Sequence, residues 1–424
     1  MSPSPLVFWF RRDLRLHDQP ALHHALRTAT ERGVPLLPVV VHDPAQTTAL
    51  TPWGFARRGP HRARWEAEAE EALHVALQGL GVLLTRLQGT TSTVLADWCR
   101  AQGATELWCE DIPCPEEEAQ VIGLQQTGLT VHTEWGSTLV AFESLPFAPE
   151  QVPDVFTAFR QKLEAAGVRE AMPLPTVTTW PGGHAGQTAT PAVHLSPGSE
   201  AVALAHLAAY CAGDHPHHYK ATRNAPDTTL GTHASSRWSP WLATGALSAR
   251  TAMAAIRQFE TDHPASRDGT YWLWFELLWR DHFRWLHRKH GLALYRNRGL
   301  SAAPLSLPPA TVQARHLAQW QTGRTGQPLV DAGMRELAAT GWLSNRLRQI
   351  VASFWVNELQ GDWRAGAAWF EHMLIDHDPC SNQGNWLYIA GRGTDPRGGR
   401  RFNPDKQTAE HDPHGHYRRR WGTA

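Results

Sequence analysis

The sequence predicts two domains of different fold class: an α/β domain with a doubly wound, five-stranded parallel sheet, followed by an all-α domain. Over the first 135 residues, short apolar runs alternate regularly with amphipathic helical stretches. After about residue 199, strand patterns cease and helical segments follow one another. A chain of 424 residues has room for two or three domains. We therefore expect the α/β domain at 1–133, a connector at 134–198 and the all-α domain at 199–424.

The apolar runs of the first domain have the continuous hydrophobic character of parallel strands that are buried on both faces. The five expected strands are Leu6–Phe10, Val34–Val41, Val82–Leu87, Glu106–Cys109 and Leu129–Val131. The helices expected between them are Pro20–Thr30, His61–Gln78, Thr93–Ala101 and Pro115–Gln126. The domain has neither a Gly-x-Gly-x-x-Gly turn nor a phosphate loop, which argues against a dinucleotide or nucleoside triphosphate site there.

The connector is rich in Pro, Gly and Thr and contains one expected helix, Asp154–Ala166. Such a composition favours turns and irregular backbone over a packed core. We therefore expect the connector to lie over the surface between the domains.

The cysteines and the hydropathy pattern indicate the cellular setting. No apolar run reaches the ~18 residues that span a bilayer. The apolar start Met1–Phe10 precedes Arg11 and Arg12, whereas a signal peptide puts its positive charge first. The five cysteines show no metal-ligand spacing and no even disulfide framework; they are Cys99, Cys109, Cys114, Cys211 and Cys380. We expect a cytoplasmic protein with reduced cysteines and no bound metal.

The net charge of zero conceals an asymmetry along the chain. Residues 1–205 contain 14 Lys+Arg and 22 Asp+Glu, whereas residues 206–424 contain 26 Lys+Arg and 18 Asp+Glu. The surplus of cations in the second half favours an anionic partner such as nucleic acid. The alternative is that both sets of charges are solvated faces.

Tryptophan, with 20 residues, is unusually frequent, although many of these side chains are explained as core anchors. Segment Tyr271–Arg280 is apolar nearly all round, as in a buried helix. It nevertheless contains Glu276 and Arg280 one helical turn apart, on the side of Trp279. An ion pair explains the two charges adequately. The functional hypothesis is a cavity wall, with an aromatic plate for stacking a base between a carboxylate and a guanidinium.

A second segment combines hydroxyls, an arginine and the start of a helix. Ser235, Ser236 and Arg237 lead to Ser239, which we expect to be the N-cap of a helix over Trp241–Ile256. Such a cluster suits a pyrophosphate. An ordinary capped helix is the alternative.

A third segment, Gly341–Gln349, predicts a helix with Asn345, Arg348 and Gln349 on one face. These polar groups precede apolar residues and would be costly to bury without partners, which a polar ligand in a cavity would supply. Asp376 is the partner we expect for Arg348. Asp376 and Asp378 lack further ligands with metal-site spacing, so we do not expect a metal there.

These motifs resemble those of one known family. Val7–Asp18 resembles the opening of photolyases and cryptochromes. Gly323–Pro328, Trp342–Arg348, Trp363-Arg364 and Asp376–Trp386 resemble their flavin-domain motifs in the same order. Typical of the cryptochrome-DASH branch are Met334–Gly341, Cys380–Asn382 with Gly384–Trp386, and Arg400–Pro404. The resemblance covers essentially the whole chain.

The resemblance implies that FAD binds in the all-α domain. It places Tyr219, Ser235, Ser236, Arg237 and Ser239 against the cofactor, with the serines and Arg237 at its pyrophosphate. Arg348 and Asp376 would flank the isoalloxazine, with Asp378 nearby and Asn382 facing its reactive nitrogen. The pocket for a flipped pyrimidine dimer would be lined by Glu276, Trp279, Arg280, Asn345, Gln349 and Tyr388.

The resemblance also implies a chain of tryptophans that reduces the flavin. Trp386 matches its inner member and Trp363 its middle member. The usual outer tryptophan aligns with Ala310, and Trp320, ten residues further on, is the expected substitute. Many relatives also bind an antenna between the domains, a folate (methenyltetrahydrofolate) in this branch, for which Glu117 is our expected contact. The alternative for Glu117 is an acidic helix N-terminus that needs no ligand.

We therefore expect a monomeric, light-driven lyase in which photoexcited, fully reduced FAD splits cyclobutane pyrimidine dimers by electron transfer. Single-stranded or looped DNA is the expected substrate, because extruding a dimer from an unpaired strand costs less. The second hypothesis is a blue-light receptor that signals without repair, although such cryptochromes typically carry a long C-terminal tail. The third is a flavoprotein that merely binds nucleic acid.

Overall fold

The computed structural model describes residues 4–182, 195–225 and 235–422. Its first domain contains one five-stranded parallel sheet in the order β3-β2-β1-β4-β5. The strands are β1 (Leu6–Trp9), β2 (Leu36–His42), β3 (Thr85–Gln88), β4 (Glu106–Glu110) and β5 (Thr130–Glu134). The chain builds the sheet outward from β1 to β3 and then returns past β1 to β4, so the expected doubly wound fold is confirmed.

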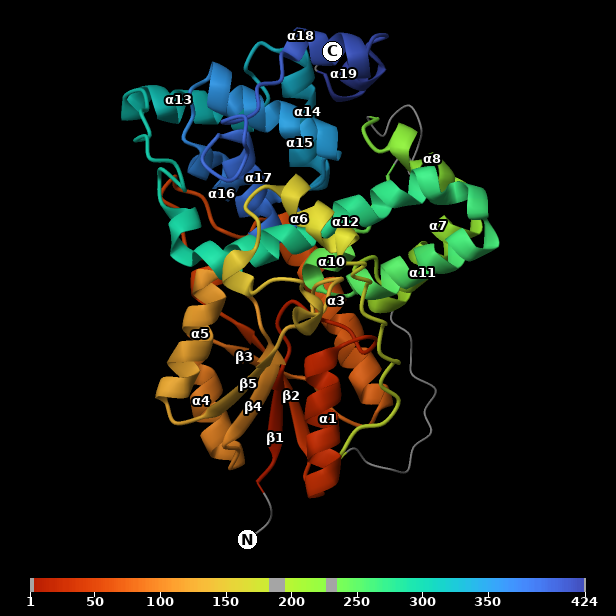
Figure 1. Ribbon diagram of the computed structural model, residues 1–424. Coiled ribbons are helices and arrows are strands. Elements are labelled where there is room, and N and C mark those ends of the chain that lie inside the picture. The colour runs from red at the N-terminus through yellow and green to blue at the C-terminus, as the bar shows by residue number, and fades with distance from the viewer. Residues whose placement is uncertain (1–3, 183–194, 226–234, 423–424) are drawn as a thin grey trace.

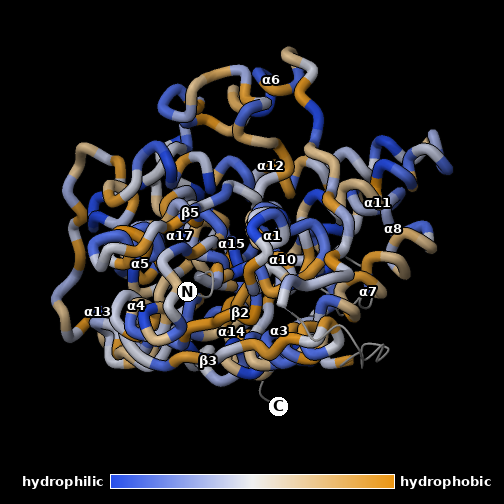
Figure 2. Tube along the Cα trace, turned by 90° about the horizontal axis from the view of Figure 1, so that it is seen from below, coloured by the Kyte–Doolittle hydropathy of each residue, from blue (hydrophilic) through white to orange (hydrophobic). Residues whose placement is uncertain are grey.

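Helices cover both faces of this sheet (Figure 1). Leu6 and Phe8 point to the face packed by α1 (Pro20–Arg32) and α3 (Pro60–Gly79). Val7 and Trp9 point to the opposite face, packed by α4 (Thr91–Gln102) and α5 (Pro115–Gln126). The trace is mostly hydrophobic along β2, whereas the surrounding helices mix polar and apolar residues, as two-sided burial of a central strand requires (Figure 2). The short α2 (Pro44–Thr47) follows β2.

The two edge strands differ most from the sequence expectation. β3 begins at Thr85 rather than Val82, and its residues alternate between half-buried and exposed. β5 continues to Glu134, beyond the apolar run that ends at Val131. An edge strand pairs on one side only and tolerates polar residues, so hydrophobicity locates it poorly.

The connector is partly buried, which corrects the expectation that it lies over the surface. It contains η1 (Phe142–Ser144), η2 (Pro149–Gln151) and α6 (Phe156–Ala165). Leu139, Val152 and Phe159 are fully buried in a core shared with the helical domain. The first half of the connector is therefore an integral layer of the second domain.

From residue 199 onward the described chain is helical, as predicted. The helices before residue 300 are α7 (Glu200–Ala212), α8 (His215–Thr222), α10 (Ser239–Thr244), α11 (Ala249–Asp262), η4 (Pro264–Ser266), α12 (Arg267–His290) and η5 (Gly291–Tyr295). Those after it are α13 (Ala310–Gln321), α14 (Pro328–Thr340), α15 (Asn345–Ser353), η6 (Phe354–Glu358), α16 (Trp363–Met373), α17 (Pro379–Ile389), α18 (Pro404–His411) and α19 (His416–Trp421). Among the described residues, no helix combines the length and apolar character that a membrane span requires.

The predicted single helix over Trp241–Ile256 is wrong, because Gly245 interrupts it. Gly245 adopts φ 75°, in the left-handed region, and ends α10. A Cβ at this position would lie 2.0 Å from the carbonyl oxygen of Arg12. The break therefore lets the N-terminal domain approach the helical domain at the main chain itself.

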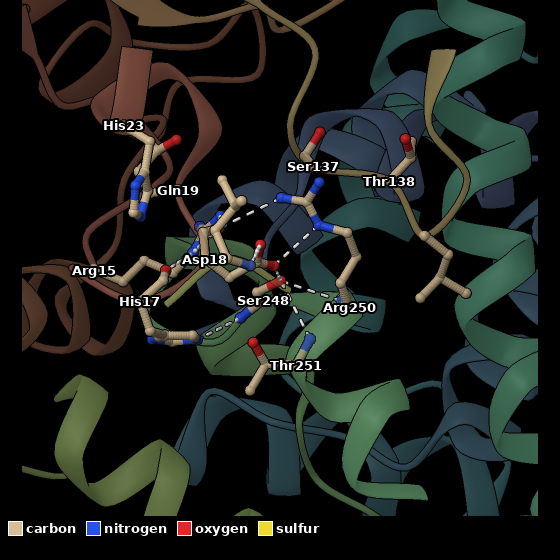
Figure 3. A network of polar contacts seen from close by, with 12 residues as sticks. Arg15, His17, Asp18, Gln19, His23, Ser137, Thr138, Ser248, Arg250 and Thr251 are labelled. Carbon is tan, nitrogen blue, oxygen red and sulfur yellow. Dashed lines mark hydrogen bonds and ion pairs between the residues drawn. The ribbon is translucent and has the colours of Figure 1, made fainter. Parts of the chain in front are cut away.

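A buried polar network continues this contact between the domains (Figure 3). The Asp18 carboxylate accepts from Arg250 Nε at 3.0 Å and from the Ser248 hydroxyl. His17 accepts from the main-chain N–H of Ser248 at 3.2 Å, and its other ring nitrogen pairs with Glu200 at 2.6 Å. Since Asp18 is fully buried, these partners compensate a charge that would otherwise be very costly to bury.

Asp281 of α12 fastens the connector and provides a pH-dependent test of this packing. Its carboxylate accepts from the main-chain N–H groups of Leu139 and Val140 at 2.8 and 3.2 Å. Burial raises the pKa of Asp281 from 3.8 to about 7. The folded state thus keeps a proton that the unfolded chain releases, and this contribution to stability is lost as the pH rises from 3.8 to about 7.

We predict that Asp281→Asn, which has no proton to lose, gains thermal stability relative to the wild type as the pH rises through this window. The effect corresponds to about 1.4 kcal/mol for each pKa unit. Thermal midpoints measured across the window test this, with the exposed Asp97→Asn as control. A constant difference between the wild type and Asp281→Asn would contradict the prediction.

Candidate functional site

Helix α15 presents three polar side chains on one face. Ser344 is its N-cap and accepts from the N–H of Leu347, so the helix begins at Asn345 rather than at the predicted Gly341. From that start, Asn345, Arg348 and Gln349 lie at i, i+3 and i+4 and share one side. All three line the same cavity. The predicted polar face is therefore confirmed.

The Asp376 carboxylate joins three distant segments. It accepts from both terminal nitrogens of Arg348, at 3.0 and 2.7 Å, in the expected ion pair. It also accepts from the Ser239 hydroxyl at 2.6 Å. Ser239 is the first residue of α10 rather than its N-cap, which corrects the prediction, and its proton is committed to Asp376. Asp376 is buried, so this bidentate pair is well placed to shape a cavity wall.

Asp378 has a different set of partners. It accepts from Arg284 at 3.2 and 2.7 Å and caps α17 through the N–H of Ser381 at 2.8 Å. Burial opposes its ionisation, but the cations of Arg284 and Arg280 together with these hydrogen bonds lower the pKa of Asp378 far below its usual value. Asp378 is therefore a permanent anion that fixes the start of α17.

These elements enclose three neighbouring cavities. Cavity A, of about 240 Å³, lies between α10, α12 and α15, and its lining contains all the predicted cofactor residues except Asn382: Tyr219, Ser235, Ser236, Arg237, Ser239, Arg348, Asp376 and Asp378. Cavity B, of about 450 Å³, is lined by all six predicted substrate residues: Glu276, Trp279, Arg280, Asn345, Gln349 and Tyr388. Cavity C, of about 110 Å³, is lined by Asn382 and Trp386 together with Arg348 and Asp376.

The three cavities share walls. Glu276, Arg280 and Asn345 line both A and B. Asn345, Gln349 and Ser381 line both B and C. A molecule in cavity B would therefore lie next to one that occupies cavities A and C.

Arg280 shows which ligand chemistry suits cavity A. Its guanidinium donates to the main-chain carbonyls of Ser137 and Leu242 and forms no ion pair with a carboxylate in the described part of the chain. Burial and the neighbouring Arg284 lower the pKa of Arg280 to about 10. Asp378 and Asp281 offset this effect only in part, and an anion in the cavity would further stabilise the charged guanidinium. Together with the hydroxyls of Ser235 and Ser236, the donor set fits a pyrophosphate.

The residues flanking cavity B include several that the sequence did not single out. Glu276 pairs with Arg223, so the expected alternative of a Glu276–Arg280 pair is not formed. Arg223 also lies over the Trp272 ring at 4.1 Å. Arg400 donates to the Tyr388 hydroxyl and forms an ion pair with Asp395 at 2.9 Å. Arg400 belongs to one of the family motifs named above, but only folding reveals that both arginines line this cavity.

Trp279 has one face already occupied. Its ring stacks on Phe156 at 3.8 Å with an interplanar angle of 10°, so the connector helix α6 supports it. Tyr388 meets Trp279 edge to face, at 5.5 Å between ring centroids. The two rings form an aromatic corner in the wall of cavity B.

The three tryptophans expected to carry electrons are all buried. Trp386 lies beside Trp320, whereas Trp363 faces a different cavity. Trp386 lines cavity C, and its ring centroid is 6.2 Å from that of Trp320. Trp320 is 0% exposed, which conflicts with a terminal member that meets solvent. Trp363 donates to the carbonyl of Asn297 at 2.9 Å and faces cavity D.

Cavity D, of about 440 Å³, lies between the domains. Its lining includes Glu117, Arg12 and Trp53 of the first domain and Trp363 and Asn382 of the second. Glu117 is buried, and burial raises its pKa although Arg12 and Arg11 oppose this. An acid at a helix N-terminus that merely faced solvent would be exposed, so the observed position suits an interdomain ligand.

Comparisons with known proteins cover both domains of the chain. A family model described as DNA photolyase matches residues 6–177, and one described as the FAD binding domain of DNA photolyase matches residues 272–423. The chain is 38% identical over 451 residues to cryptochrome DASH of Synechocystis sp., which covers 99% of this chain and 87% of that protein. It is 37% identical to cryptochrome DASH of Danio rerio, over 99% of this chain and 84% of that one.

Solved structures give the same result. The Synechocystis cryptochrome superposes with a TM-score of 0.89 at 37% identity, covering 99% of this chain and 89% of that one. A class III photolyase from Agrobacterium tumefaciens has a TM-score of 0.78 at 28% identity, covering 99% and 87%.

The chain therefore belongs to the photolyase/cryptochrome family, and its helical domain is the FAD-binding domain of that family. Its similarity to cryptochromes DASH extends over the whole chain, in agreement with the branch that the sequence motifs indicated.

We predict that Arg348→Ala loses bound FAD, because it leaves the buried Asp376 carboxylate unpaired, at a cost of about 3 kcal/mol. The ratio of flavin to protein absorbance after gel filtration measures the loss. Arg401→Ala, which breaks an exposed pair with Glu358, is the matched control and should keep its flavin. Full flavin content in Arg348→Ala would refute the assignment of this pair to the cofactor site.

Proposed function

We propose that the protein is a blue-light-driven lyase that repairs cyclobutane pyrimidine dimers, with a preference for single-stranded or looped DNA. One observation carries the proposal: the six predicted substrate residues line a single cavity that shares walls with the cofactor site. When bound, photoexcited and fully reduced FAD would supply the electron that splits the dimer. The protein supplies binding, orientation and electrostatics.

The chemistry of cavity B suits a flipped dinucleotide. Trp279 and Tyr388 offer an aromatic corner for pyrimidine rings. Asn345 and Gln349 offer amides that donate to and accept from base edges. Arg223 and Arg346 line the same cavity and provide cations for phosphates.

Glu276 stands where the substrate and cofactor cavities meet. Burial raises its pKa, although Arg223 opposes this. A carboxyl group that holds its proton more readily can donate a hydrogen bond to a pyrimidine carbonyl as well as accept one. We propose that Glu276 binds the dimer in this way.

The preference for unpaired DNA follows from the cost of extrusion. Flipping bases out of a duplex costs a few kcal/mol, and less from a single strand. Since Phe156 covers one face of Trp279, stacking on that ring is limited to its other side. We propose that binding in cavity B provides too little free energy to compensate the full cost of opening a duplex.

Cavity D is the proposed antenna site. Its place between the domains and the buried Glu117 support a folate, with the Glu117 carboxylate as a contact for polar ring atoms. The protein is proposed to act as a cytoplasmic monomer.

The decisive assay illuminates the reduced protein with dimer-containing oligonucleotides, single- and double-stranded, and measures restored thymines. We expect repair of both, faster on the single strand. Trp279→Leu should weaken dimer binding by about 1–3 kcal/mol, roughly 5- to 150-fold, while retaining FAD. Trp274→Leu, on the same helix but outside the lining of cavity B, is the control. Absence of repair on both substrates would reject the lyase and favour a light receptor.

Photoreduction tests the tryptophan assignments. We expect Trp386→Phe to abolish flavin photoreduction, since this ring lines cavity C, and Trp363→Phe to slow it strongly. Trp320→Phe should slow it if electrons leave Trp386 through its buried neighbour. Trp98→Phe, in α4 of the first domain and packed in a different core cluster, controls for loss of a tryptophan. Unchanged photoreduction in Trp320→Phe would exclude that route.

A further inference from the structure

Three side chains far apart in sequence gather their ligand atoms at the domain interface. Cys114 stands at the start of α5 in the first domain, while His287 of α12 and Cys380 of α17 belong to the second. The two sulfur atoms are 3.1 Å apart, and all three ligand atoms lie within 4.8 Å of one another. Each residue is at most 1% exposed. No other such cluster of His, Cys, Asp and Glu occurs in residues 4–182, 195–225 and 235–422.

The imidazole of His287 is oriented as metal-binding histidines are. Its Nδ1 lies 2.7 Å from the carbonyl oxygen of Phe283 and must donate to it, because a carbonyl only accepts. In the neutral ring, the other nitrogen, Nε2, then carries the lone pair. This buried Nε2 has no hydrogen-bond partner in the structure. A backbone carbonyl that fixes the tautomer of a ligating histidine is a common feature of metal sites.

The surroundings suit a compact cation with soft ligands. Ile112, Phe283 and Leu286 form an apolar shell around the two cysteines. Two thiolates and a neutral imidazole would balance the double positive charge of zinc, so the assembled site is neutral in a place where net charge is costly.

Cavity D lies close to the cluster. Its lining includes Pro115 and Pro379, which are next to the two cysteines in sequence, and Tyr295, whose ring is 5.8 Å from that of His287. The three ligand residues themselves are buried behind this lining, so zinc would enter from cavity D through a small movement of these side chains.

We propose that Cys114, His287 and Cys380 bind a zinc ion that ties the α/β domain to the helical domain, with water at the fourth position. The site is independent of the proposed repair function and replaces the expectation, drawn from cysteine spacing, that the chain binds no metal. Zinc–sulfur bonds of about 2.3 Å hold thiolates slightly farther apart than they lie here, an adjustment that side-chain rotation supplies. The present separation exceeds the roughly 2.05 Å of a disulfide.

The first test uses the complete flavoprotein, stripped with a chelator and titrated with zinc against a chromophoric competitor. We expect stoichiometric zinc binding, and a thermal midpoint that rises with zinc and falls again with chelator. Cobalt substitution should give the ligand-field bands of a tetrahedral thiolate site on the long-wavelength side of flavin absorption. These measurements need no variant.

The second test compares variants. Cys114→Ser and His287→Ala should lower zinc affinity by more than about 10-fold, since even loss of a second-shell partner costs that much. Cys211→Ser, a half-buried cysteine of α7 outside the cluster, should bind zinc like the wild type. The proposal would be overturned if Cys114→Ser bound zinc with the same affinity as the wild type. A Cys114–Cys380 disulfide, found by non-reducing mass spectrometry in the protein as purified, would also overturn it.

Discussion

The buried carboxylate of Asp376 accepts hydrogen bonds from two segments far from it in the chain. Arg348 reaches it from α15 and Ser239 from α10, while Asp376 itself lies between α16 and α17. An unpaired carboxylate at this depth would cost several kcal/mol, so the three segments must meet for the domain to fold. Their meeting forms the common wall of cavities A and C. The stability of the domain and the proposed binding of the cofactor at this wall therefore depend on the same few bonds.

A second constraint sets how the two domains meet. The main chain of Arg12 approaches Gly245 too closely for any side chain, and Asp18 is buried against Arg250 and Ser248. These contacts restrict the relative position of the two domains, because the main chains touch directly and the buried charge of Asp18 requires its partners. They fix the position of the C-terminal edge of the sheet relative to α16 and α17, and cavity D is the space left between them. The proposed antenna site and the Cys114–His287–Cys380 cluster both depend on that geometry.

The helical domain separates its aromatic residues by environment. Trp279 and Tyr388 stand at a polar cavity, where one face or edge remains available to a ligand. Trp320, Trp363 and Trp386 are buried in an apolar core, from which Trp363 reaches cavity D and Trp386 cavity C. The proposed recognition role thus falls on aromatic side chains surrounded by arginines and amides, and the proposed electron-transfer role on those surrounded by apolar residues. Composition alone could not distinguish the two groups.

The sequence by itself determined the order of strands and helices along the chain and the polar face of α15, because periodicity encodes them. The pairing of Arg348 with Asp376 was expected because a buried guanidinium needs an anion, and folding brings the two distant residues together. The sequence analysis located edge strands poorly and missed the break at Gly245, where the main chain of Arg12, more than two hundred residues away, leaves no room for a side chain. Tertiary structure alone decided that Glu276 pairs with Arg223, that Trp320 is buried, and that Cys114 meets Cys380. Each of these depends on contacts between distant segments, for which spacing along the chain carries no signal.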